Sequence, residues 1–381
     1  MPFTGKATFS AGATLPEIAE DVGDLISINS PHETPLLDAL GDASRTARST
    51  VHEWLEDTLL LDNDLIDTVS ASNVLVMQHV DRFRVGDLIR FDTSGTEVAL
   101  VVGIDPDSSS IQLTRGYGGT STVTVTAGQR VHVIGNASLE GADAADARFT
   151  VRTRQQNYTQ IFTATVSVSG SELAANQIAV RDELAWQKNL RSRELLRDLE
   201  NSVINGVASA ATPAGSGSVR RTMRGLISFA QTNRFVVGQN GFPADTALSE
   251  TQLNLALREI WKTSSGQVDL IVVGGREKRA INAFIAADRR FYPQSDSYRD
   301  MVSVYESDFG VCRVVLSRHV PTGSALLLDS TRIGVMPLSG RSFQYTPLAR
   351  TGDAENGQLV GEYTVECRNE AAHGLIRGFT A

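Results

Sequence analysis

The segment that most constrains the fold runs from Ser171 to Gly206. At 100° per residue its large apolar side chains fall on one broad face. Asn176 is a suitable N-cap, and Asn205-Gly206 tolerates the positive φ that often ends a helix. The pattern predicts a helix over about 176–205, roughly 40 Å long. The face needs neighbours on more than one side, because it has a centre line and two flanks: Ile178, Ala185, Leu196, Leu199 and Val203, flanked by Trp186 and Leu190 and by Leu184 and Leu195.

The opposite strip of this helix is polar. Arg191, Glu194 and Arg197 follow one another at a spacing of three residues, so opposite charges can meet. Two further basic clusters follow, at 220–224 (Arg220, Arg221 and Arg224) and at Arg289-Arg290. Nucleic-acid binding favours exposed aromatics among the arginines, and only Phe291 and Tyr292 are present. Charge pairing between neighbouring chains is therefore the favoured interpretation.

Charge and composition exclude several classes of protein. The net charge of −9 over 381 residues argues against broad attraction to nucleic acid or anionic membrane. No run of 18 apolar residues occurs, and the first residues lack a basic-then-apolar signal, so a soluble chain that is not exported by that route is expected. The two cysteines, Cys312 and Cys367, exclude a disulfide framework and are expected to be reduced and buried.

The N-terminal segment is predicted to be an arm with one short helix. Thr14 to Ile26 begins with a capping-box pattern, Thr14 with Glu17, and carries one apolar face: Leu15, Ile18, Val22 and Leu25. A helix of this length is not stable alone in water. Its apolar face is therefore expected to dock on the body of the protein or on another chain.

A β module interrupts the first half of the chain. Val51–Leu59 is predicted to be a strand, and from about 73 to 136 short β runs alternate with turn residues, typical of a small barrel or sandwich. A second long strand is expected over 148–169, so that it and the strand around Trp54 bracket the module as two legs of one hairpin. The connection before the module is interpreted as a solvated acidic turn: Asp62, Asn63, Asp64 and Asp67.

A second α/β unit is predicted after a flexible linker at 208–218. Ser249 with Gln252 is expected to cap a helix through Trp261. The buried strand 268–273, the turn Gly274-Gly275 and a helix over 276–287 follow. The last forty residues alternate as strands and are expected to return to the first unit.

Motifs for catalysis, cofactors or metals are weak. Gly274-Gly275 lacks the Lys-Ser/Thr of a phosphate loop, and Gly116–Gly119 is better explained as a hairpin turn. The six histidines show no HxxxH or HxH pairing, and no GxSxG occurs. Glu53 and Asp57 are expected to pair with arginines rather than to act as an acid–base pair. We therefore expect no cofactor and no metal, and an enzyme is not the favoured interpretation.

Six short stretches, in order, are similar to those of one known family. They are Thr34–Leu37 (TPLL), 53–59 (EW with DTL), Asn157–Phe162 (NYTQIF), Tyr305–Gly310 (YESDFG), Gly361–Glu366 (GEYTVE) and Arg368–Gly374 (RNEAAHG). The chain resembles the major capsid protein of tailed double-stranded DNA bacteriophages (Caudoviricetes). The resemblance implies an α+β, Hong Kong 97-like fold with a long spine helix, an extended loop and an inserted small all-β module.

The resemblance also implies a division of the chain. An N-terminal arm would span 1–47, and an extended loop 48–139 would hold the β module at about 73–136. A peripheral domain would combine 140–207, including the spine helix at about 176–205, with 335–381. An axial domain would span 208–334.

The resemblance implies a function as well. Such subunits form hexamers and pentamers that close an icosahedral shell around the genome, in a virion assembled in the host cytoplasm. Expected partners are further copies of the chain, a portal protein, a scaffold and decoration proteins. DNA would be enclosed without sequence-specific binding, and no membrane is involved.

Hypothetical assembly contacts follow from these interpretations. The arm helix would clamp a neighbour, Trp54 would anchor the extended loop, and the β module would lie on the outer surface. Charged contacts are assigned to Arg191, Glu194, Arg197, Arg220 and Arg221. Two alternatives stay open: an encapsulin-like nanocompartment shell protein, and an α/β enzyme or carbohydrate-binding protein with a β accessory module.

Overall fold

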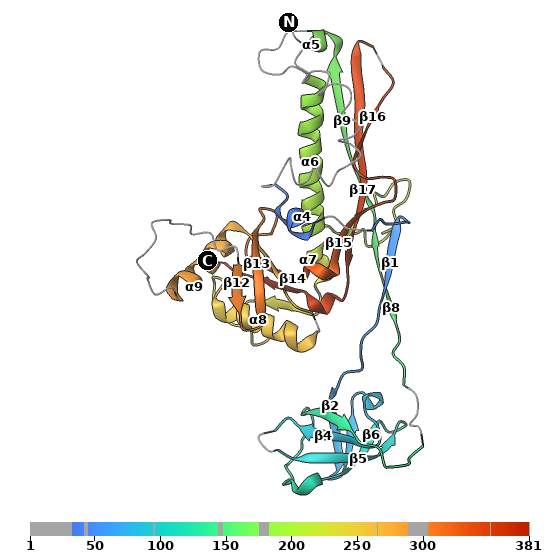
Figure 1. Ribbon diagram of the computed structural model, residues 1–381, viewed down its shortest axis with the longest axis vertical. Helices are drawn as coiled ribbons and strands as arrows, with labels where there is room; N and C mark the ends of the chain where they lie inside the picture. The colour runs from blue at the N-terminus through green and yellow to red at the C-terminus, as the bar shows by residue number, and fades with distance from the viewer. Residues whose placement is uncertain are drawn as a thin grey trace. The chain divides into compact units, whose positions relative to one another are not determined.

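The protein consists of two compact units in a computed structural model (Figure 1). The structure describes residues 33–41, 45–93, 96–143, 148–174, 183–264, 266–288, 304–350 and 352–380. The first unit contains the described parts of Met1–Glu56 and Arg154–Ala381, and the second is Asp57–Thr153. The arm helix predicted over 14–26, including Leu15, Ile18, Val22 and Leu25, lies outside the described residues.

A long helix packs along an extended sheet in the first unit. Helix α6 (Glu183–Asn205) lies beside strand β9 (Gln160–Ser169), which pairs antiparallel with β17 (Ala354–Cys367) over ten residue pairs (Figure 1). The other neighbours of β17 are β15 (Ile333–Pro337) and β16 (Gln344–Pro347). The short helix α5 (Gly170–Ala174) follows β9.

The buried face of α6 is concentrated in its C-terminal half, at Leu195, Leu196, Leu199, Val203 and Ile204. The expected start at about 176, with Ile178, lies in 175–182, outside the described residues. Trp186, expected on a buried flank, is 49% exposed. That prediction was wrong for this chain, because the hydrophobic core contacts α6 only from Leu195 onward.

A six-stranded sheet forms the second core of this unit. Its order is β10 (Arg234–Val236), β18 (Gly374–Arg377), β14 (Ser324–Leu328), β11 (Leu270–Val273), β13 (Gly310–Leu316) and β12 (Val304–Ser307). Two helices pack against this sheet. Helix α8 (Glu250–Thr263) contacts β18, and helix α9 (Gly275–Asp288) contacts β11 and β13. The Ser249–Gln252 capping box is confirmed. Two shorter helices, α4 (Pro35–Leu40) and α7 (Leu226–Phe229), pack beside α6 and the sheets.

The C-terminal strand corrects one expectation. Residues 335–381 were assigned as one block with the spine helix, but β18 lies between β14 and β10 in the six-stranded sheet. Gly374, Leu375 and Ile376 are buried on both faces, so they complete that core. Sequence alternation identifies a strand but does not show which of two sheets it joins.

The second unit is a closed barrel with its own core. Its strands follow the order β2 (Asn63–Ala71), β3 (Val74–Met77), β6 (Ser110–Thr114), β5 (Val98–Asp105), β4 (Asp87–Phe91) and β7 (Arg130–Asn136), which returns to β2. Ile66, Leu75, Ile89, Phe91 and Ile111 are among the side chains that fill its interior. Single-turn 3-10 helices occur at Val80–Arg82 and Tyr117–Gly119 in this unit, and at Ser330–Arg332 and Glu370–Ala372 in the first.

The barrel begins ten residues earlier than the sequence predicted. The residues interpreted as a solvated acidic turn belong to β2 or directly precede it. Asp64 is buried, and it accepts hydrogen bonds from the backbone N–H of His79 at 2.6 Å and from Arg82 Nη1 at 2.9 Å. A charge satisfied in this way is tolerated inside a barrel. The glycine-rich segment at 116–119 is also not a hairpin turn, because β6 and β7 are not neighbours.

The two legs expected around the β module are present. Strand β1 (Val51–Glu56) pairs with β8 (Thr153–Tyr158) in a two-stranded sheet. Cys312 and Cys367 are free and buried, as predicted. Among the described helices, none is both long enough and apolar enough to span a membrane.

Candidate assembly surfaces

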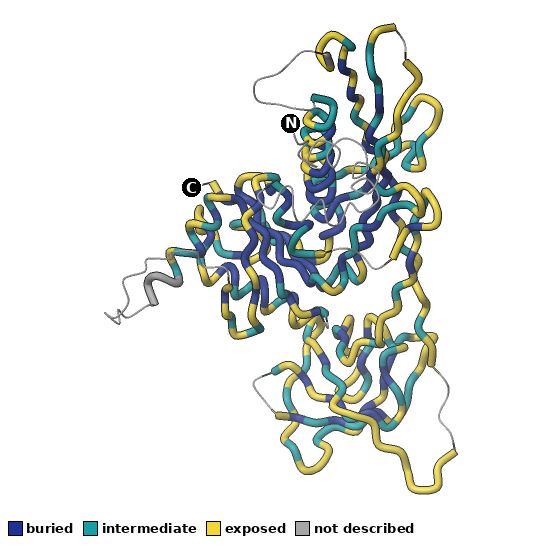
Figure 2. The backbone as a smooth tube through the Cα atoms, turned by 45° about the horizontal axis from the view of Figure 1, so that its top comes forward, coloured by how far each residue is buried: buried dark blue, intermediate teal, exposed yellow. Residues whose placement is uncertain are grey.

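Large apolar side chains are exposed on the segments that link the barrel to β1 and β8. Almost every described residue of 57–62 and 137–153 is exposed (Figure 2). Leu59 is 92% exposed and Phe149 is 84% exposed. Leu61, Leu139 and Val151 are exposed as well. We call these five residues the leg surface. The four most exposed large apolar side chains among the described residues, Leu59, Leu139, Phe149 and Val151, all belong to these two segments, so the leg surface is a candidate contact with another molecule.

The legs carry ion pairs within the chain. Glu53 Oε2 lies 3.4 Å from Arg154 Nη1, and Asp57 Oδ2 lies 3.4 Å from Arg152 Nε. These pairs confirm the expected pairing of Glu53 and Asp57 with arginines. The Thr150 hydroxyl donates to Asp57 Oδ1 at 2.6 Å and lowers the pKa of that carboxyl. Both pairs are exposed, so they orient the legs more than they stabilise the fold.

Trp54 packs inside its own subunit. Its side chain is 8% exposed, and its ring lies 6.0 Å from that of Phe229, measured between centroids. The indole Nε1 donates to Glu56 Oε1 at 2.8 Å, and Glu56 Oε1 also accepts from the backbone N–H of Asn369 at 2.6 Å. Strand β1 is therefore joined to the core at Trp54, before the chain reaches the exposed segment 57–62.

The predicted charged contacts differ in where their partners lie. Arg221 pairs within the subunit: its Nη2 lies 2.5 Å from Glu362 Oε1, and its Nε donates to the Thr159 carbonyl at 2.7 Å. Arg191 pairs with Glu194 on the same helix at 2.5 Å. Arg197 is more exposed and lies 3.9 Å from Asp198, and Arg220 is exposed in a loop. Arg289-Arg290 lies outside the described residues.

The buried carboxylates that the sequence analysis missed include Glu200, Glu362 and Glu366. Glu362 accepts from Thr159 Oγ1 at 2.5 Å and pairs with Arg221 and, at 2.9 Å, with Arg341. Every residue of β17 from Gly361 to Cys367 is buried. The sequence did contain a signal for these buried acids, since two glutamates interrupt a run of β-favouring residues. An acid in a strand buried on both faces is rarely found unless it is paired.

Glu366 joins strand β1 to strand β17. Its Oε2 lies 2.7 Å from His52 Nε2, and its Oε1 lies 3.0 Å from Arg368 Nε. The hydrogen bond from His52 lowers the pKa of Glu366 most, and the positive charges of His52, Arg368 and Arg45 add to that shift against the opposing effect of burial. β1 and β17, more than 300 residues apart in sequence, are thus connected by one side chain.

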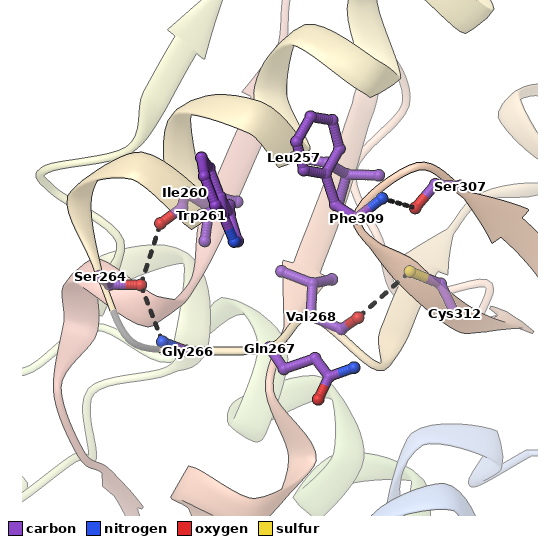
Figure 3. Close-up of a pocket in the computed structure, with 10 residues that line it drawn as sticks. All are labelled: Leu257, Ile260, Trp261, Ser264, Gly266, Gln267, Val268, Ser307, Phe309 and Cys312. Carbon is purple, nitrogen blue, oxygen red and sulfur yellow. Dashed lines mark hydrogen bonds between the residues drawn. The ribbon is translucent and has the colours of Figure 1, made fainter.

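A cavity lies beside the six-stranded sheet of the first unit. It has a volume of about 340 Å³ and is lined by residues of α8, β13 and the connecting segments (Figure 3). Trp261 at its rim is 63% exposed and lies 6.0 Å from the ring of Phe309. Cys312 donates to the Val268 carbonyl at 3.2 Å, and burial raises the pKa of its thiol to about 11. Because the thiol stays protonated, it is not an activated nucleophile.

Metal ligation has no structural support in the described part of the chain. No group of three or more His, Cys, Asp or Glu side chains there is placed to hold an ion. The described residues instead provide exposed apolar side chains for contacts with other molecules and buried ion pairs that stabilise the fold.

A comparison with solved structures finds similar chains in phage and encapsulin structures. A structure of Microbacterium phage Oxtober96 shares 12% identity, with 88% of each chain covered and a TM-score of 0.47. A structure of Mycobacterium phage Bobi shares 12% identity over 89% of this chain and 93% of that chain, with a TM-score of 0.42. The holo-SrpI encapsulin from Synechococcus elongatus shares 10% identity over 60% of this chain and 77% of that chain, with a TM-score of 0.41. A search of curated proteins finds no match.

The class of protein is a structural subunit of a phage capsid, as the sequence resemblance implied, and its architecture mixes helices and strands. The family model for the SU10 major capsid protein matches residues 3–380. The chain belongs to the SU10 major capsid protein family. Its place in the virion capsid follows from that membership.

Proposed function

We propose that this major capsid protein self-assembles as hexamers and pentamers into an icosahedral shell around phage double-stranded DNA, and that its role is structural, without catalysis. The leg surface is the observation that carries the proposal. Leu59 and Phe149 are almost fully exposed in one chain, so burying them and their neighbours requires another molecule. Many modest contacts per subunit, repeated over a closed shell, add up to a stable container.

The proposed division of the chain keeps the arm at 1–47 and the extended loop at 48–139. The axial domain is 208–334 together with β18, because β18 pairs with β14. The peripheral domain combines 140–207 with the rest of the C-terminal segment, including β17. The β module is proposed to lie on the outer surface, where a compact insertion is tolerated.

Contacts with other molecules are also proposals. Arg197 and Arg220 have exposed guanidinium groups suited to pairing across subunits, whereas Arg221, Arg191 and Glu194 already pair within one chain. Portal, scaffold and decoration proteins are proposed partners. Packaged DNA is proposed to be enclosed without sequence-specific contacts, which suits a subunit with a net charge of −9.

The clamp role of the arm has a direct test. Leu15, Ile18, Val22 and Leu25 are proposed to pack on a neighbouring subunit, because a short amphipathic helix is not stable alone. Deletion of residues 1–30 should leave a folded subunit that does not form normal closed shells. Closed particles of normal size from the deleted chain, seen by electron microscopy, would exclude the clamp.

The central experiment combines sizing with substitution of the leg surface. The purified protein should form capsomers or megadalton closed particles, whereas an enzyme or carbohydrate-binding protein would remain a monomer or dimer. Nuclease-protected genomic DNA inside particles separates a virion shell from an encapsulin-like compartment, which would hold a protein cargo.

The double variant Leu59→Ser with Phe149→Ser should fold normally, because both side chains are exposed, but should not assemble. Val85→Ser is the matched control, since Val85 is also an exposed apolar residue, 60% exposed, but lies on the barrel and outside the leg surface. Normal particles from the leg variant would contradict the proposal, as would equal loss of assembly in the control.

A further inference from the structure

Helix α4 is held by a carboxylate from another helix. The six-residue helix has no capping bond from the side chain of its N-cap residue, Thr34. Glu200 of α6 supplies the acceptor: its Oε2 accepts from the backbone N–H of Leu36 at 3.2 Å and of Leu37 at 3.5 Å. These are the positions at which a helix normally receives its cap. A residue 164 positions away in sequence therefore caps α4.

The same carboxylate also joins a third element. Glu200 Oε1 accepts from the Ser317 hydroxyl at 2.8 Å, directly after β13. Glu200 is fully buried, and Leu36 and Leu37 are buried beside it in the core. We call Leu36, Leu37, Glu200 and Ser317 the α4 junction. Leu36 and Leu37 belong to the N-terminal arm proposed over 1–47, and residues 1–32 precede them in the chain. The junction therefore attaches the arm to the core.

We propose that the α4 junction is a proton-dependent attachment, in which Glu200 binds a proton when α4 is docked and releases it when α4 detaches. A buried carboxylate with no cationic partner in the junction is costly when ionised. The three hydrogen bonds that it accepts offset part of that cost. The docked junction therefore tolerates both protonation states, and burial shifts the balance towards the neutral one.

The charged groups around the junction support this direction. Burial, with a smaller contribution from the nearby Asp38 of α4, raises the pKa of Glu200 to about 7 against the lowering effect of the hydrogen bonds from Ser317, Leu37 and Leu36. Asp38 has a buried Oδ1 without a hydrogen-bond partner, and burial raises its pKa despite Arg313 of β13.

Among the described residues, the other elements that contact α6 provide no cation to the junction, and the only charged side chain of α5 is the acid Glu172. The sequences of α7 (LISF) and β9 (QIFTATVSVS) have no titratable side chain, and Glu362 of β17 is committed to Arg221 and Arg341. His319, two residues beyond Ser317, has a pKa lowered by burial and then by Arg318 and Arg197.

The sign of the pH dependence follows from linkage. The docked state binds the proton more tightly than a detached state in which Glu200 reaches water with its ordinary pKa of 4.5. Attachment is therefore strongest below about pH 4.5, weakens as the pH rises, and levels off above about pH 7. The change in the docked-to-detached ratio is on the order of 100-fold.

Amide hydrogen exchange of the full-length subunit tests the proposal. Protection of Leu36 and Leu37, corrected for intrinsic exchange, should fall tenfold or more between pH 5.5 and 8.5. Glu200→Gln should keep the protection and remove its pH dependence, because an amide can still accept from α4 and can donate to Ser317. Glu306→Gln, an exposed acid on β12, is the control and should keep the wild-type profile.

Two further measurements keep the test decisive. If Glu200→Gln does not fold, Ser317→Ala replaces it as the test variant. The hydrogen bond from Ser317 lowers the pKa of Glu200, so its loss should move the midpoint of the protection profile to higher pH. Amides of β11 should show no parallel trend, which separates release of α4 from global unfolding. A flat wild-type profile, or a Glu200→Gln profile like that of the wild type, would overturn the proposal. These readouts do not depend on shell formation, so they stand or fail separately from the proposed function.

Discussion

Single buried carboxylates connect parts of the chain that are far apart in sequence. Glu362 joins β17 to Thr159, to Arg221 and to Arg341, and Glu366 joins β17 to the leg strand at His52. Each buried acid is stable because its oxygens receive several charged or polar donors. Removing the acid leaves those donors without a partner, which is why we expect large effects from single substitutions at these positions.

The first residue-scale prediction concerns Glu362. Glu362→Ala should lower the free energy of unfolding by about 3 kcal/mol, because it leaves the half-buried Arg221 guanidinium and the buried Thr159 hydroxyl without their acceptor. Glu306→Ala, at an exposed acid, should change it by less than about 0.5 kcal/mol. Chemical denaturation of both variants measures the difference. Equal effects would show that the buried pairs contribute nothing net.

The second residue-scale prediction concerns how the stability of the fold depends on the ionisation of Glu366 at acidic pH. Its folded-state pKa is held below the ordinary value of 4.5, chiefly by the hydrogen bond from His52, so its contribution to stability is present above about pH 4.5 and is lost as the pH falls through the folded value. Glu366→Gln should therefore destabilise the protein at pH 7 and flatten the loss of stability between pH 5 and 3. Denaturation midpoints across that range test this, and a variant as acid-sensitive as the wild type would contradict it.

At the scale of elements, β17 shows why sequence pattern alone is insufficient. Its alternation predicts a strand, but its glycines mark where rings from the neighbouring segment cross it. A Cβ at Gly361 would lie 2.3 Å from a ring carbon of Phe343, and one at Gly357 would lie 2.0 Å from the Tyr345 hydroxyl oxygen. Phe343 in turn packs 4.8 Å from the ring of Tyr363, measured between centroids. These glycines are required by close approach rather than by backbone conformation.

The element-scale prediction follows from that contact. Gly361→Ala should lower the free energy of unfolding by about 1–3 kcal/mol, because the buried Phe343 ring has to move. Gly334→Ala on the neighbouring β15 is the control, since its nearest contact is at 4.0 Å and the residue lies in ordinary strand conformation. Thermal unfolding of both variants distinguishes them. A Gly361→Ala protein as stable as the control would contradict the overpacking argument.

At the scale of the whole molecule, the two units have separate cores. Among the described residues, the side chains that form the barrel core come from within residues 66–133. The buried pair of Glu97 with Arg115, at 2.5 Å, fixes the loop after β6 inside the same unit, because Glu97 also accepts from the backbone N–H groups of Gly116 and Val123. No stabilising contact from elsewhere is needed to explain this fold.

We therefore predict that residues 57–153 fold when expressed alone. The isolated segment should unfold cooperatively and show dispersed amide resonances, and the rest of the chain, with Asp62 joined to Ala137 through a Gly-Ser linker, should melt within a few degrees of the full chain. Circular dichroism and calorimetry make both measurements. An isolated segment without a cooperative transition would show that the barrel depends on the first unit.

The sequence by itself determined the elements that rest on local physics. The long helix predicted over about 176–205 and described over 183–205, the Ser249 capping box and the strand, turn and helix predicted over 268–287 follow from periodicity, capping and turn chemistry, which act over a few residues. Six short motifs in order indicated the capsid family.

Only the tertiary structure decided what depends on distant partners. It placed β18 in the six-stranded sheet, extended the barrel to Asn63 and buried Asp64, Glu200 and Glu362. An isolated acidic residue in a sequence predicts solvent exposure, because burying an unpaired charge is costly. Its donors lie on strands and helices tens to hundreds of residues away, and nothing local to the acid specifies which donors the folded chain brings to it.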